Sequence, residues 1–444
     1  MSAKLTTQRR RRGLVAASAG YFFVLLDVTI VNVALARIGS DLGASRSSLQ
    51  WVVDAYALVL AAFMLGAGDL VDRLGSRRLF IAGLSLFGLA SSACGAAPAI
   101  GFLIGGRIVQ GLGAAAILPT SLAVVNQLFT DPVQRPRAIG VWAGIGSSAL
   151  VLGPILGGLL VASLGWRAIF WLNVPLVLAA LGLAFAFVPD AASTRGERPD
   201  LQGQVLGTAA LATAVFALIE SGHGGLLSPP ALVGAGAAAS LLAAFLVTER
   251  RSPRPMLDLQ WFSSPEFSGA NAGAALMNLG TLGALFTISL CLQQRYGLSP
   301  VRTGLTLLPL AAPLALLTPF TGRLVALSGA RGPAGLGLIA CGLAYLGLAV
   351  HPRLTGGADW LLLATAGTGM AVAVPGLVTG ATEALGSERA GIASAVNNTS
   401  RQGGGVIGVA LIGGIASISA SLAASAAALL LGGTTALLLM PLDG

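Results

Sequence analysis

Apolar stretches long enough to cross a bilayer recur along this chain from residue 14 to residue 440, and they limit the fold more than any other feature. A helix of about 20 mainly apolar residues matches the hydrocarbon thickness of a membrane. Hydrophobic residues make up 55% of the sequence and charged residues 10%, and the longest polar segments, such as 189–200 and 249–266, are too short to bury a core. We therefore expect an all-α integral membrane protein whose function lies between its helices.

Basic residues indicate the topology of these helices, because Lys and Arg gather in the cytoplasmic loops of membrane proteins. When the N-terminus is placed inside, most of the 26 Lys and Arg residues fall on the cytoplasmic side. This bias predicts that both termini lie inside and that the helix count is even. We place fourteen transmembrane helices near residues 14–38, 50–70, 79–97, 100–126, 136–162, 167–188, 201–220, 231–248, 267–291, 301–324, 333–350, 359–381, 390–418 and 421–440.

The remaining composition excludes other classes of protein. A net charge of +9 would suggest nucleic-acid binding in a soluble protein, but here it is the topology signal, and no nucleic-acid partner is expected. Cys94, Cys291 and Cys341 have no paired spacing, so neither a disulfide framework nor a metal site is indicated. The basic start and the apolar run after it imitate a signal peptide, but Asp27 interrupts the run, and we expect a retained helix.

The two halves of the sequence repeat their glycine and proline signals at a nearly constant offset, as expected for a transporter built from parallel repeats. Gly367 and Gly369 repeat Gly111 and Gly113, whereas Leu363 stands where the first half has a basic residue. The polar groups are therefore confined mainly to the first half. The expected domains are a basic N-terminus at 1–13, a six-helix bundle at 14–188, an inserted helix hairpin at 201–248 and a second six-helix bundle at 267–440.

A charge-dense turn at residues 68–78 separates two apolar runs. Its pattern is Gly-x-Leu-x-Asp-Arg-x-Gly-x-Arg-Arg, carried by Gly68, Asp72, Arg73, Gly75, Arg77 and Arg78. The glycines let two helix ends approach closely, while the acid and the arginines can pair or cap helix ends. The turn resembles the cytoplasmic loop between helices 2 and 3 of major facilitator transporters.

Asp27 and Arg107 are the first candidates for a functional pair. Asp27 lies near the middle of the first helix, where an unpaired carboxylate is costly and tends to face a partner or a wet cavity. Arg107, on the fourth helix with Gln110 at helical spacing, needs an anionic partner, and Asp27 is the obvious one. A proton on Asp27 would weaken the pair and so switch the protein between two arrangements of its helices. A static pair that only fixes helix packing is the alternative.

Other polar and aromatic residues give weaker signals for a substrate site. Asp54 lies near the outer interface, where a helix-start role and a substrate contact are equally consistent with its position. Asn398 and Arg401 belong to a polar band beside glycines, for which interhelical hydrogen bonding is the first interpretation and substrate contact the second. Phe23 and Trp142 are candidates for an apolar pocket, and Asn32 and Gln110 are further candidates for substrate contact.

The fifth predicted helix is rich in glycine and contains a proline. We expect the proline to kink the helix and the glycines to allow close contact and bending. The residues are Gly140, Gly144, Gly153, Pro154, Gly157 and Gly158.

Together these motifs resemble the fourteen-helix drug:proton antiporter family of the major facilitator superfamily, which contains multidrug and antibiotic-resistance exporters. Leu26 to Leu35, which includes Asn32, matches the family's helix 1 signature, and Arg107 to Ala115 matches its helix 4 motif. Gly153-Pro154-x-x-Gly157-Gly158 matches the antiporter motif of helix 5. The resemblance implies that Asp72 and its arginines stabilise one access state, that Arg107 assists proton transfer, and that the Gly-Pro motif separates exporters from importers.

The sequence therefore predicts a proton-coupled antiporter of the bacterial inner membrane that exports amphipathic drugs or antibiotics by alternating access. We expect no enzymatic activity and no cofactor, the proton gradient being the energy source, and the family resemblance implies a monomer. An exporter of an endogenous metabolite or siderophore is the alternative that the sequence does not separate from it. A proton-coupled importer is a weaker third alternative. A membrane enzyme and a channel fit less well, since no catalytic cluster or repeated polar ring is present, and a passive scaffold would leave Asp27 and Arg107 without a role.

Overall fold

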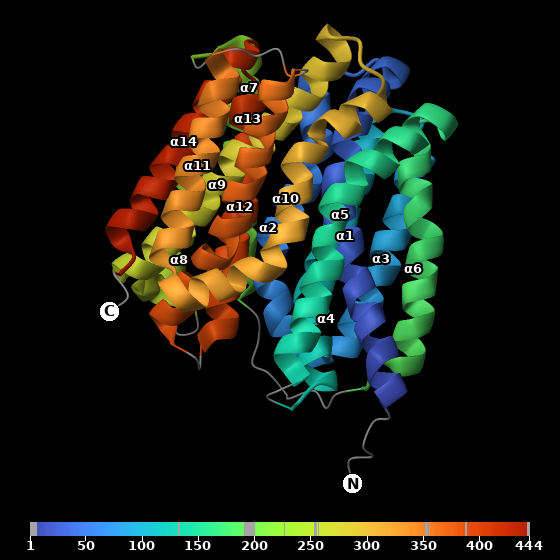
Figure 1. The fold of residues 1–444 in the computed structure, drawn as a ribbon, viewed down its shortest axis with the longest axis vertical. Helices are drawn as coiled ribbons and strands as arrows, with labels where there is room; N and C mark the ends of the chain where they lie inside the picture. The colour runs from blue at the N-terminus through green and yellow to red at the C-terminus, as the bar shows by residue number, and fades with distance from the viewer. Residues whose placement is uncertain are drawn as a thin grey trace.

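This computed structural model describes residues 7–131, 134–190, 200–225, 227–252, 255, 257–350, 354, 356–386 and 389–441. Within them the chain forms fourteen α-helices and no strand (Figure 1). The helices are α1 (Thr7–Leu42), α2 (Arg46–Leu74), α3 (Ser76–Gly95), α4 (Ile100–Leu128), α5 (Gln134–Leu164), α6 (Arg167–Phe187), α7 (Leu201–Gly224), α8 (Pro229–Arg251), α9 (Pro265–Leu290), α10 (Pro300–Ser328), α11 (Arg331–Val350), α12 (Gly357–Leu385), α13 (Ala390–Gly413) and α14 (Ile418–Leu439). A 3₁₀ segment, η1 (Leu259–Ser263), precedes α9, and a π-helical segment, η2 (Cys291–Arg295), follows it.

Thirteen of the helices in the described residues are long and apolar enough to cross a membrane. The helix that falls short is α13, because its polar band, including Asn398 and Arg401, lowers its hydropathy. It nevertheless packs along α9 and α2 inside the molecule. The chain is thus a multi-pass membrane protein.

The predicted helix positions agree with the observed ones to within a few residues at most ends. Two ends differ more. The first helix begins at Thr7, so residues 7–13 of the segment predicted as a basic N-terminus are helical. The thirteenth helix was expected to reach residue 418 but ends at Gly413, because Gly414 follows it and the Ser417 side chain caps the next helix.

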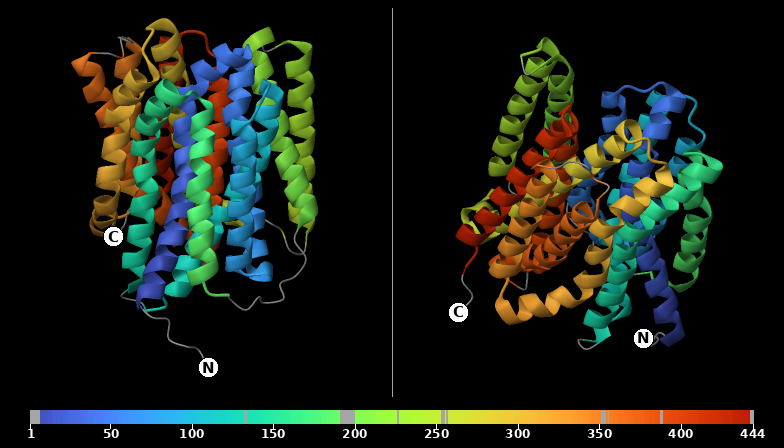
Figure 2. Two further views of the ribbon diagram at one scale, coloured as in Figure 1. Left: turned by 90° about the vertical axis from the view of Figure 1, so that its right-hand side faces the viewer. Right: turned by 45° about the horizontal axis from the view of Figure 1, so that its top comes forward.

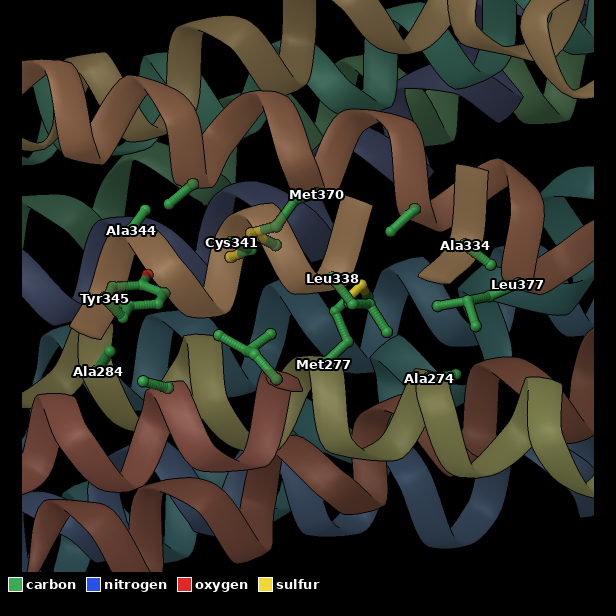
Figure 3. Packing of buried hydrophobic residues seen from close by; sticks show 14 of the residues in the cluster. Ala274, Met277, Ala284, Ala334, Leu338, Cys341, Ala344, Tyr345, Met370 and Leu377 are labelled. Atoms are coloured by element: carbon green, nitrogen blue, oxygen red, sulfur yellow. The ribbon is translucent and has the colours of Figure 1, made fainter. Parts of the chain in front are cut away.

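Among the hydrophobic clusters of the described residues, the two largest each belong to one group of helices. One is built from side chains of α9 to α14, and Figure 3 shows part of it, with Leu338, Tyr345 and Leu377 packed between helices. The other is built mainly from α1 to α6, around residues such as Phe80 and Phe87. Most helix packing lies within a group, and the main contacts between the groups are α5 against α10 and α2 against α13.

The hairpin of α7 and α8 lies at the side of the molecule (Figure 2). Helix α7 packs against α2 from the first group and α13 from the second, whereas α8 packs chiefly on α7. The hairpin therefore borders the line where the two groups meet.

Glycines at equivalent places in the two halves make equivalent contacts. A Cβ at Gly111 on α4 would lie 2.7 Å from the Tyr56 carbonyl oxygen on α2, and one at Gly367 on α12 would lie 2.1 Å from the Leu310 carbonyl oxygen on α10. These helix pairs approach so closely that only glycine fits. The repeat in the sequence is thus a repeat in backbone packing.

Hydrogen bonds between the two groups gather at one end of the molecule, which we name the closed end. Arg46, at the start of α2, donates to the carbonyl oxygens of Gly413 and Ile415 at 2.8 and 3.1 Å. Gln293, in η2, donates to the Val33 carbonyl oxygen of α1 at 3.0 Å. In Figure 1, α1 begins and α14 ends at the opposite end.

Candidate functional site

The centre of the site is an ion pair between Asp27 on α1 and Arg107 on α4. Both side chains are buried, with exposed fractions of 0% and 1%. Arg107 Nη1 donates to Asp27 Oδ2, and Arg107 Nε donates to the Val52 carbonyl oxygen of α2 at 3.0 Å. The structure thus brings together the two residues proposed as a pair and ties a third helix to them.

Gln110, one turn after Arg107, closes this pair into a network. Its Nε2 donates to Asp27 Oδ1 at 2.8 Å, and its Oε1 accepts from Arg107 Nη1 at 2.9 Å. Both carboxylate oxygens of Asp27 therefore have a donor. Removing one charged side chain from such a buried network is costly, because the remaining groups lose their charge compensation and their hydrogen bonds together.

Two further residues belong to the cluster, and sequence reasoning assigned them no role. The Arg107 guanidinium lies 4.2 Å from the ring centroid of Tyr56, which donates to the Val24 carbonyl oxygen at 3.2 Å. Asn173 on α6 is 1% exposed, donates to Ser91 Oγ at 3.0 Å and faces Asp27. The sequence signal that could have identified Asn173 is its amide inside the otherwise apolar helix α6, since a buried polar group in a membrane needs a partner.

Asp54 has a different environment. It is fully buried on α2, and in the described part of the chain neither of its carboxylate oxygens has a hydrogen-bond partner. One turn earlier on the same face, Gln50 donates to the carbonyl oxygens of Val409 and Ala410 on α13 at 3.0 and 3.1 Å. Asp54 is thus placed on the face of α2 that meets α13, outside the network of Asp27.

We expect Asp54→Leu to raise the stability of this state by about 1–3 kcal/mol, because it removes a buried carboxyl group that has no partner here. Thermal unfolding of the purified protein in nanodiscs measures the change. Asp27→Leu is the matched control and should lower the unfolding temperature, since it strands Arg107. A lower unfolding temperature for Asp54→Leu would show that the carboxyl group is stabilised by something other than the contacts described here.

Aromatic side chains of the first group face a cation of the second. Tyr21 on α1 and Trp142 on α5 stack with ring centroids 4.2 Å apart, and Trp142 Nε1 donates to Ser121 Oγ at 3.2 Å. Arg401 on α13 donates to Asn398 Oδ1, and its charge lies within electrostatic range of Tyr21. Three of the residues proposed for substrate contact therefore lie where the two groups face each other.

Two more of the residues proposed for substrate contact, Phe23 and Asn32, are packed into the protein. Phe23 is 3% exposed and belongs to the hydrophobic core of α1 to α6. Asn32 is 3% exposed and donates to the Val28 carbonyl oxygen of its own helix at 2.7 Å. In this state both residues contribute to packing.

The charged turn between α2 and α3 is anchored to α6. Gly75 has a φ of 81°, a conformation that favours glycine, and Arg77 Nη2 donates to the Phe185 carbonyl oxygen at 2.7 Å. Arg78 lies 3.7 Å from Asp190, but both are exposed, so this ion pair adds little stability. Gly68, Asp72 and Arg73 lie in the last turns of α2, so the turn expected at 68–78 is helical except at Gly75, and the side chains of these three residues are not among those described.

The glycines of α5 bring it close to two helices. Cβ atoms at Gly153 and Gly157 would lie 2.0 Å from Thr29 Oγ1 and 2.9 Å from Ile30 Cγ1 on α1. One at Gly158 would lie 2.7 Å from the Pro300 carbonyl oxygen of α10. Pro154 lies inside the helix, whereas a Cβ at Gly140 would meet nothing within 4 Å. The motif therefore joins the ion-pair helix to the second group.

Similarity to known proteins decides the family. The sequence profile of the Major Facilitator Superfamily matches residues 17–409. The chain belongs to this superfamily. It is 39% identical to the Multidrug resistance protein Stp of Mycobacterium tuberculosis over 92% of this chain and 76% of that protein. It is 35% identical to the Methylenomycin A resistance protein of Streptomyces coelicolor, covering 90% and 84% of the two chains. As a member of this superfamily the protein is a transporter and not an enzyme.

Solved structures of the superfamily share the fold. A bacterial homologue of the human lysosomal transporter Spinster superposes with a TM-score of 0.69 at 17% identity, covering 98% of this chain and 97% of that one. The peptide transporter POT superposes with a TM-score of 0.73 at 15% identity, covering 96% of this chain and 94% of that one.

Among the described residues of our chain, no group of three or more His, Cys, Asp and Glu side chains is arranged to hold a metal ion.

Proposed function

We propose that this protein is a proton-coupled antiporter that exports amphipathic drugs or antibiotics by alternating access. The observation that carries the proposal is the buried network of Asp27, Arg107 and Gln110. An acid and a base that neutralise each other inside a membrane form a two-state element, because one proton on the acid cancels their attraction. The names of the relatives, multidrug and antibiotic resistance proteins, support the substrate class.

The proposed cycle uses Asp27 as the carrier of the proton. Protonation from the outer side would release Arg107 and the substrate together, and loss of the proton to the inside would restore the pair and favour rebinding. The wall of the substrate site would be formed by Trp142, Asn398 and Arg401, with Asp54 at its outer mouth. No cofactor takes part, and the proton gradient supplies the energy.

The proposed topology places both termini in the cytoplasm of a bacterium, with the chain as a monomer in the inner membrane. The closed end then faces outward, and the structure corresponds to an inward-facing state. The two six-helix bundles, 14–188 and 267–440, would rock against each other, with the hairpin at 201–248 beside them. Arg77 would hold the inner ends of α3 and α6 together in this state, while Gly153, Pro154 and Gly157 let α5 bend.

Transport by the purified protein in proteoliposomes tests the proposal. With an imposed pH gradient we expect accumulation of a fluorescent drug such as ethidium against its own gradient, together with proton movement in the opposite direction. A proton ionophore should abolish the accumulation. Drug flux that ignores both the gradient and the ionophore would replace the antiporter with a uniporter.

A further inference from the structure

A cavity of about 380 Å³ lies between α2, α3, α4 and the first turns of α7, outside the network of Asp27. Its walls are apolar, and include Phe63, Leu86 and Leu112. Leu70 and Leu201, which also border it, are 37% and 66% exposed, so the cavity opens to the surface of membrane-spanning helices. The opening lies toward the end opposite the closed end, because α2 ends there and α3 and α7 begin there.

The polar end of the cavity is formed by Asp200 and Gln204. Asp200 Oδ1 caps α7 by accepting from the Gly203 backbone N–H at 2.8 Å, whereas Asp200 Oδ2 is buried and has no hydrogen-bond partner in the described residues. Gln204 is 8% exposed, and its Nε2 donates to the Ala62 carbonyl oxygen at 2.5 Å. Its Oε1 is also buried and without a partner among those residues. Asp200 and Gln204 thus each bring to this end of the apolar cavity an acceptor that has no donor among the described residues. The Glu249 carboxyl group of α8 lies beside Asp200, because both would meet a Cβ at Gly203, so the charge at this end is negative.

A glycine makes room for the second acceptor. A Cβ at Gly66 on α2 would lie 2.4 Å from Gln204 Oε1, so any other residue there would displace the amide. Buried acceptors nearly always have a donor from the protein, from water or from a ligand. The volume falls in the range of small-molecule sites, about 300–1,000 Å³, in which apolar walls are combined with few polar groups.

We propose that this cavity is a lateral binding site for an amphipathic amine that arrives from the bilayer. The apolar body would lie against Phe63 and Leu112, and the ammonium group would donate to Asp200 Oδ2 and Gln204 Oε1. A negative carboxylate next to an amide oxygen favours a positively charged donor over a neutral one. This inference rests on the proposed export function and adds to it a binding site for the exported amines outside the network of Asp27.

Photolabelling of the full chain tests the site without any gradient or transport. The probe is a long-chain alkylamine that carries an aliphatic diazirine, added to protein in nanodiscs of phosphatidylcholine and phosphatidylglycerol, and labelled peptides are mapped by mass spectrometry. We expect labels on the segments of α2, α3 and α7 that border the cavity. Labels confined to the region of Asp27 and Trp142 would overturn the proposal.

Two variants and one control sharpen this test. Asp200→Asn keeps the oxygen that caps α7 but replaces the partnerless acceptor with a donor, and Ala116→Leu fills the cavity from α4; both should lower labelling at least about tenfold. Gly105→Leu on the same helix, where an added Cβ meets nothing within 4 Å, should leave it unchanged. Equal labelling in Asp200→Asn and the native chain would overturn the role of the carboxylate.

Competition distinguishes a drug site from a lipid site, because phosphatidylethanolamine also carries an ammonium group on an apolar body. We expect an amine drug to displace the probe and phosphatidylethanolamine in the nanodisc to leave most labelling in place. Displacement by the lipid alone would overturn the proposal. If labelling behaves as expected while proteoliposomes show no proton-coupled flux, only the proposed transport function fails.

Discussion

Asp27→Asn is expected to reduce proton-driven drug accumulation in proteoliposomes to background. The asparagine cannot carry a proton through the cycle, and it leaves the Arg107 guanidinium, which is 1% exposed, without a counter-charge. Breaking one side of a buried ion pair typically costs about 3–5 kcal/mol, so the unfolding temperature should fall as well. Loss of transport alone would therefore be ambiguous between a coupling role and a structural role.

A second variant separates these roles. Asp27→Asn combined with Arg107→Gln removes both charges and leaves amides that can hydrogen-bond with Gln110, which should restore most of the stability. If the pair only fixes helix packing, transport should return together with stability. We expect stability to return and gradient-driven transport to stay at background. Recovery of coupled transport in the double variant would remove Asp27 from the centre of the mechanism.

The positions of the helices could be predicted from the sequence because the bilayer imposes one length and one polarity on every span. The pairing of Asp27 with Arg107 could also be predicted, since two opposite charges in such apolar surroundings have few other ways to be compensated. The residues around them could not. Tyr56 and Asn173 reach the pair from α2 and α6, and their distance in the sequence gives no sign that their side chains meet.

Some residues that the sequence suggested for substrate contact belong to the ion-pair network in the structure, and others serve only in packing. Gln110 joins the ion pair, whereas Phe23 and Asn32 are used for packing and for a bond within α1. The difference depends on which face of a helix meets which neighbour, and this is set by tertiary packing. Likewise, the lack of a hydrogen-bond partner for Asp54 among the described residues depends on the fit of α2 against α13 and has no sequence signature.

The contact between α5 and α10 at the closed end is expected to control the balance between access states, and Gly304→Ala tests it. A Cβ at Gly304 would lie 2.2 Å from the Pro154 carbonyl oxygen, far inside the ordinary contact distance of 3.4–4 Å. Overfilling such a contact typically costs about 1–3 kcal/mol. The cost applies only where the helices touch, so the variant should favour the state in which the closed end has opened, by about 5- to 150-fold.

Spin labels at the exposed residues Ser40 on α1 and Gln294 in η2 report this opening, because they belong to different groups at the closed end. In Gly304→Ala we expect a longer distance to become the main population. Gly140→Ala on α5 and Gly322→Ala on α10 are matched controls, since an added Cβ meets nothing within 4 Å at either position, and both should keep the native distribution. A native distribution in Gly304→Ala would mean that α5 and α10 separate enough to accept the methyl group while the closed end stays shut. The hydrogen bonds of Arg46 and Gln293 would then be what holds that end together.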